Sequence, residues 1–255
     1  MRFPAVAALL LLAFCAAFAA GCGGASGGVF KKQYEYEEEL YLSLDGSATL
    51  AVNASVPALV ALRGFDLPVD PRARIDRNKV RALFDGPGVQ VTRVSLSRRD
   101  GRRFVHLGMD VSDVRQLSRV APFAWSSYRF DRNGDEMDFT QVVGKAAGKP
   151  VGDVGWTGRE LVAFRMHIPS RIPWHNATDH TVQRGNIVAW EQPLSERLQG
   201  VPLDIEVHME PKSILYSTLL LFGATIVAAA LMFAVILWWV VKRGGRESEV
   251  ATSRP

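Results

Sequence analysis

Alternating apolar and polar residues dominate the middle of the chain, from residue 31 to residue 210. A period of two predicts half-buried β-strands. The apolar parity changes between Val91 and Val94, which predicts a β-bulge. Turn-forming dipeptides between alternating runs favour hairpins. They predict three hairpins, which turn at Asp45-Gly46, Asp100-Gly101 and Asn133-Gly134. Further strands are expected at 162–168, 187–190 and 203–209.

Short helical patterns separate these strands. One is expected at 56–62, where Ser55 is suited to cap the N-terminus and Gly64 the C-terminus. Two more are expected at 80–84 and 114–117. Hairpins that alternate with single helices indicate an α+β domain with a mostly antiparallel sheet. The domain is expected to span residues 31–210 and to form one core.

The segment from Val56 to Leu62 is apolar on every face. A helix of this kind is either buried in the core or faces lipid or an apolar ligand. Burial in the core is the favoured explanation, and Leu59 and Leu62 are candidate ligand-binding residues under the other one. Trp174, amid polar residues in the long loop 170–186, is a third candidate because such a loop can cover a site or contact a partner.

An uncharged apolar run occupies residues 214–241. At about 1.5 Å per residue it exceeds the roughly 30 Å hydrocarbon core of a bilayer, which predicts one tilted transmembrane helix. Aromatic and basic residues near its ends are expected to anchor it: Tyr216, Trp238, Trp239, Lys242 and Arg243. The basic residues favour a cytoplasmic tail at 242–255, with the domain on the outer face of the membrane.

The N-terminal residues 4–20 are apolar and follow Arg2, which is typical of a secretory signal peptide, expected to span residues 1–21. Cys22 follows at once, and the only other cysteine, Cys15, lies within the signal. The exported chain therefore has no partner for an internal disulfide. We expect Cys22 to be lipidated, with ordinary cleavage beside it as the alternative, and residues 22–30 to form a Gly-rich tether.

Charge and motifs exclude several functions. The chain has a formal charge of +4, but the excess lies near its ends, so a nucleic-acid surface is not expected. There is no P-loop, G-x-G-x-x-G or G-x-S-x-G motif. Neither Asp131–Glu136 nor His175–His180 follows a standard calcium or zinc spacing, so we expect no metal, no cofactor and no enzyme. His106, His167 and His208 fall among the polar positions of strands, which predicts that they lie on outer faces.

The order of features resembles the LppM-type domain family of bacterial envelope proteins. The shared features are the lipobox-like Ala19-Ala20-Gly21-Cys22, an early Asp-Gly hairpin, a C-terminal span, and a run of His175-Asn176, Gly185-Asn186 and Trp190. The resemblance implies a membrane-tethered, non-enzymatic module with affinity for lipids, and no catalytic residues.

We therefore expect a membrane-anchored extracytoplasmic binding module of the bacterial cell envelope, with a lipid or another apolar molecule as ligand. The first alternative is a structural or assembly protein that contacts other membrane proteins. The second is a hydrolase, which requires a histidine within hydrogen-bonding reach of a nucleophile or an acid. An enclosed apolar cavity would favour the binding module, whereas a filled core with an exposed apolar patch would favour the assembly protein.

Overall fold

The computed structural model describes residues 32–252, apart from the side chains of Ser217 and of residues 240–252. The predicted signal peptide, Cys22 and the whole predicted tether therefore lie outside the described residues, as do the side chains of Lys242 and Arg243 and the last three residues of the chain.

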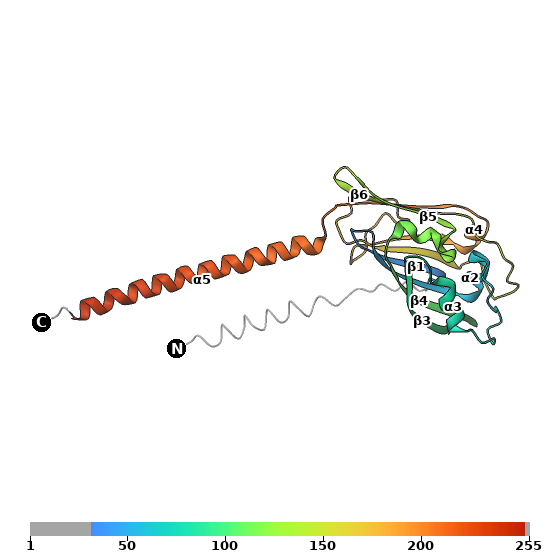
Figure 1. Ribbon diagram of the computed structural model, residues 1–255, viewed down its shortest axis with the longest axis horizontal. Helices are drawn as coiled ribbons and strands as arrows, with labels where there is room; N and C mark the ends of the chain where they lie inside the picture. The colour runs from blue at the N-terminus through green and yellow to red at the C-terminus, as the bar shows by residue number, and fades with distance from the viewer. Residues whose placement is uncertain (1–31, 253–255) are drawn as a thin grey trace. The chain divides into compact units, whose positions relative to one another are not determined.

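Two β-sheets form separate layers of the domain (Figure 1). Every neighbouring pair is antiparallel except β1 and β7, which are parallel. The larger sheet has the strand order β3 (Val89–Arg99), β4 (Arg102–Val111), β2 (Ala48–Ser55), β1 (Tyr34–Leu42), β7 (Leu161–His167) and β9 (Ile187–Pro193). The smaller sheet has the order β5 (Ser126–Asn133), β6 (Glu136–Val143), β10 (Leu203–Met209) and β8 (Trp174–His175). The α+β class and the three hairpins are confirmed, and a register shift between Val91 and Arg93 confirms the predicted bulge.

Short helices connect the strands. The first, α2 (Val56–Arg63), begins where the Ser55 hydroxyl accepts a hydrogen bond from the Ala58 N–H at 3.1 Å, and ends at Gly64, whose positive φ of 72° suits glycine. The predicted helix at 114–117 is a 3₁₀ helix, η1 (Val114–Arg119). The other short helices of the described residues are α3 (Arg77–Phe84), η2 (Ala121–Phe123) and α4 (Leu194–Leu198). The long helix α5 (Ile214–Thr252) follows the last strand.

The core lies between the two sheets and beneath α2. One asparagine ties the layers together: Asn176 Oδ1 accepts hydrogen bonds from Trp190 Nε1 of the larger sheet at 2.8 Å and from the Glu206 N–H of the smaller sheet at 2.9 Å. Asn186, with a positive φ of 60°, donates from Nδ2 to the Ile168 carbonyl at 2.7 Å. These residues of the family-like run thus stabilise the fold, because they join segments that are distant in sequence.

Charged side chains also occur inside the domain. Arg102 and Glu35 form an ion pair of 2.9 Å, in which the side chains are 5 % and 0 % exposed. Arg102 Nη1 also donates to the carbonyls of Val154 and Gly155, and Trp156 Nε1 donates to the second oxygen of Glu35. This buried pair therefore holds the second Gly-rich segment of the chain, residues 144–155, whose sequence alone predicts no regular structure.

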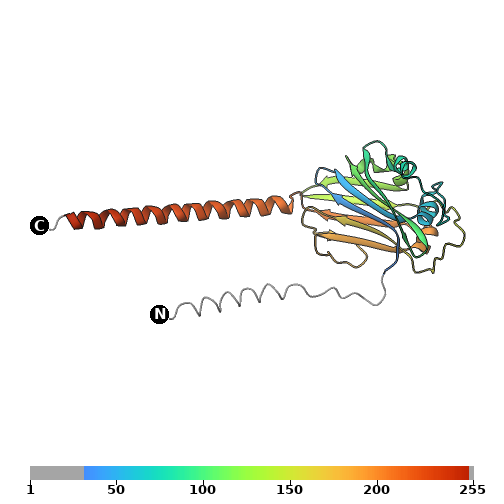
Figure 2. The same ribbon diagram turned by 90° about the horizontal axis from the view of Figure 1, so that it is seen from below.

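Within the part of the chain that the structure describes, one helix is long and apolar enough to cross a membrane. It is the segment Ile214–Trp239 of α5, which is the long helix in red in Figure 2. Its side chains are exposed, including those of Tyr216, Trp238 and Trp239. Apolar residues exposed over this length agree with the predicted span, because water would not solvate them favourably.

Candidate binding site

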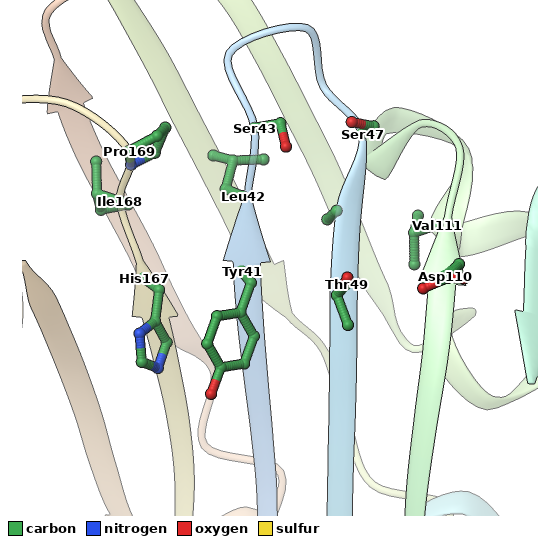
Figure 3. Close-up of a pocket in the computed structure, with 11 residues that line it drawn as sticks. Tyr41, Leu42, Ser43, Ser47, Thr49, Asp110, Val111, His167, Ile168 and Pro169 are labelled. Carbon is green, nitrogen blue, oxygen red and sulfur yellow. The ribbon is translucent and has the colours of Figure 1, made fainter. Parts of the chain in front are cut away.

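A pocket of about 500 Å³ opens on the outer face of the larger sheet (Figure 3). The strand register places His167 of β7 beside Tyr41 of β1, Tyr41 beside Thr49 of β2, and Thr49 beside Asp110 of β4. These four side chains form a row across four strands. Ser43 and Ser47, from the turn between β1 and β2, border the row.

Two aromatic side chains, Tyr41 and His167, form one side of this pocket, and Glu39 orients the histidine. The rings of Tyr41 and His167 are stacked, with centroids 3.9 Å apart and an interplanar angle of 16°. His167 Nε2 lies 2.7 Å from Glu39 Oε1. Partial burial, together with the neighbouring Glu39 carboxylate, raises the pKa of the Tyr41 phenol, which stays neutral at physiological pH. Tyr41 is nonetheless 43 % exposed, so its ring is available to a ligand.

The pocket lies beside the start of α5. Pro169 lines the pocket, and its carbonyl accepts a hydrogen bond of 3.0 Å from the N–H of Ile214, the first residue of α5. Ser170 and Ser213 form an isolated antiparallel bridge, and the Glu210 N–H donates to the Arg171 carbonyl at 2.9 Å. The segment between β10 and α5 is therefore attached to the same end of the domain as the pocket.

The space between the sheets is too small for an acyl chain. It is bordered by Glu38, Tyr128 and Gln141 among apolar residues, and its volume is about 10 Å³. This is about the room that one water needs, whereas ligand pockets typically measure about 300–1,000 Å³.

The three residues proposed for ligand binding do not share a site. Leu59 and Leu62 of α2 are fully buried in the core, and neither lines any of the four described pockets. Trp174 is 48 % exposed on β8, where its ring meets His208 edge-on at 5.0 Å. Their role in ligand binding stays a prediction.

A histidine within reach of a hydroxyl, the requirement for a hydrolase, occurs on the larger sheet. Ser97 Oγ lies 2.7 Å from His106 Nε2, and His106 Nδ1 lies 2.9 Å from Asn53 Oδ1. Partial burial, with the charges of Arg93 and Arg99, lowers the pKa of His106, so the ring is neutral at pH 7. Nothing in the sequence indicated this arrangement, because Ser97, His106 and Asn53 come from three different strands.

The backbone around Ser97 nevertheless does not form the oxyanion hole that acyl transfer commonly uses. Backbone N–H groups of a strand lie in the plane of the sheet, whereas the Ser97 side chain stands on its face, so these groups do not point at an oxyanion formed there. None of the four described pockets includes Ser97 or His106.

We expect a fluorophosphonate probe to label the wild-type chain no more than the Ser97→Ala variant, because without oxyanion donors the hydroxyl gains little reactivity. Labelling is measured by mass spectrometry of the intact chain. Labelling that requires both Ser97 and His106 would contradict this expectation and revive the hydrolase hypothesis.

Comparison with known proteins gives little beyond the fold. No family model matches the chain, and no curated protein matches it. A search of solved structures finds the folded domain of LppM from Mycobacterium tuberculosis, determined by NMR, with a TM-score of 0.38 and 14 % sequence identity. The match covers 72 % of this chain and 94 % of that one. The resemblance noted in the sequence is thus supported only as a weak likeness in fold, and it carries no inference about function.

Proposed function

We propose that this chain is a membrane-anchored extracytoplasmic module of the bacterial cell envelope that binds the polar part of a lipid at the bilayer surface. The observation that carries the proposal is the position of the Tyr41 pocket beside Ile214, where the apolar helix begins. If α5 spans the bilayer, its first turn lies near the headgroups, and the pocket lies near them too.

The chemistry of the pocket favours a headgroup over an acyl chain. Its lining offers the hydroxyls of Ser43, Ser47 and Thr49, the carboxylate of Asp110 and the ring of Tyr41. Hydroxyls and a carboxylate accept hydrogen bonds, and an aromatic face attracts a cation. A headgroup that carries an ammonium group therefore fits better than an anionic one.

The runner-up is an assembly protein that contacts other membrane proteins. The filled space between the sheets supports it, since an assembly protein needs no cavity. The exposed Trp174 supplies an aromatic side chain of the kind that is enriched at protein interfaces.

Native mass spectrometry of the full chain, released from nanodiscs of phosphatidylethanolamine and phosphatidylglycerol, tests the proposal. We expect one phosphatidylethanolamine to stay bound per chain. Tyr41→Ala and Asp110→Asn should each weaken retention by about tenfold, which corresponds to about 1.4 kcal/mol. The control is Ser127→Ala, an exposed change on the smaller sheet that should leave retention unchanged.

No retained lipid on the wild-type chain, or equal retention in all variants, would contradict the proposal. Crosslinking to membrane proteins through Trp174 would then support the assembly function instead.

A further inference from the structure

Three side chains of metal-ligating type converge on the outer face of the smaller sheet. Glu136 and Asp138 come from β6 and His208 from the neighbouring strand β10, where the register pairs His208 with Asp138. One ligand atom from each lies within 4.8 Å of the others. His208 Nδ1 is 3.1 Å from Asp138 Oδ1 and 3.4 Å from Glu136 Oε2.

The imidazole of His208 is oriented from its other side. Its Nε2 lies 3.3 Å from Glu206 Oε1, and the edge-on contact with Trp174 borders the ring. A hydrogen on Nε2 that is donated to Glu206 leaves the lone pair of Nδ1 facing two carboxylates. In this tautomer three electron-rich atoms repel one another, and a metal cation bound between them would remove that repulsion.

Asp138 is also held from outside the cluster. Its Oδ2 accepts a hydrogen bond of 2.9 Å from Asn133 Nδ2. Its Oδ1, which lies 3.1 Å from His208 Nδ1, is shielded from solvent and has no other hydrogen-bond donor among the described residues. When His208 carries its hydrogen on Nε2, this shielded oxygen has no donor, which is costly, and the atom then favours a positively charged ligand. Outer partners of this kind commonly fix metal ligands in place.

The two distances from His208 Nδ1 to the carboxylate oxygens agree with a tetrahedral metal ion. Ligand atoms bound at about 2.0–2.1 Å, the usual bond length to zinc, lie about 3.3 Å from one another. The separations of 3.1 and 3.4 Å around Nδ1 agree with this value. One imidazole nitrogen and two carboxylate oxygens suit zinc better than calcium, which prefers oxygen ligands alone.

We infer that Glu136, Asp138 and His208 form a binding site for a divalent transition-metal ion of the zinc class. The three side chains are partly exposed, so a fourth position is open to water or to a ligand. His208 lies in the last strand before α5, so the site is close in sequence to the predicted membrane surface. The inference does not depend on the Tyr41 pocket, which lies on the other sheet.

Zinc titration of the full chain in detergent, after removal of metal with a chelator, tests the site. Binding is measured by competition with a chromogenic zinc indicator. We expect one tight site per chain, which Asp138→Asn and His208→Gln each weaken by more than about tenfold. Asn133→Ala, which removes only the outer partner of Asp138, should weaken binding less. His106→Gln, a histidine change on the other sheet, is the matched control and should leave binding unchanged.

Circular dichroism of the metal-free variants shows whether they fold. A second readout is the visible absorption of bound cobalt, which is intense in four-coordinate sites and should be lost in His208→Gln. The inference is overturned if the wild-type chain binds no zinc. It is also overturned if folded Asp138→Asn and His208→Gln bind zinc as tightly as the wild-type chain.

Discussion

Replacing Arg102 by methionine should lower the free energy of unfolding by about 3–5 kcal/mol, because it leaves the Glu35 carboxylate buried without its cation. The Glu35 side chain has no exposure, and Trp156 Nε1 at 3.3 Å is the other donor that the structure gives it. The substitution also removes the donor to the Val154 and Gly155 carbonyls. The Gly-rich segment should therefore loosen before the rest of the domain unfolds.

Urea unfolding of the full chain in detergent, followed by tryptophan fluorescence, measures this loss. Arg115→Met is the matched control: its partner Asp113 lies at 2.8 Å, but Arg115 is 49 % exposed, so solvent screens the pair and the loss should be much smaller than for Arg102→Met. The double variant Glu35→Leu with Arg102→Met should regain much of the stability, because no buried charge is left. Equal costs for Arg102→Met and Arg115→Met would show that the Glu35 pair is solvated.

The local parts of this fold were predictable because their signals are local. A turn dipeptide and the alternation on either side of it fix a hairpin, and the hairpins at Asp45-Gly46, Asp100-Gly101 and Asn133-Gly134 are all present. The parallel pairing of β1 with β7 was not predictable, since the two strands lie more than a hundred residues apart and nothing in either sequence specifies the partner. The short strand β8 lies within the loop 170–186, which was expected to cover a site or to contact a partner. Its two residues are too few to show the alternation of a strand.

The same limit applies to the sites. The polar parity of strand residues correctly placed His106, His167 and His208 on outer faces. It gave no sign of their partners, because a contact such as that of His167 with Glu39 depends on the strand order. The zinc-type cluster was missed for this reason: Asp138 and His208 become neighbours only through the pairing of β6 with β10.

Helix α2 shows that an apolar segment does not by itself identify a ligand site. A helix that is apolar on every face has two explanations, and the sequence cannot separate a buried helix from one that faces a ligand. In the structure α2 is buried among core residues, with Gly-rich backbone on its C-terminal end: the N–H groups of Ala147 and Gly148 donate to the carbonyls of Leu62 and Ala61. The segment that covers the helix end is therefore the one that the Arg102 pair holds in place.

Replacing Leu59 by aspartate should unfold the domain, whereas Leu59→Ala should cost about 2–5 kcal/mol. Leu59 has no exposed surface, so a carboxylate there has neither water nor a cation for a partner. Val142→Lys, at a position that is 40 % exposed on β6 and opposite Asp204 of β10, is the control and should cost less than about 1 kcal/mol. Thermal unfolding followed by circular dichroism measures all three.

A folded Leu59→Asp chain that has lost a bound lipid would instead place Leu59 in a ligand site. That outcome requires α2 to move away from the core, because the space between the sheets as it stands holds about one water.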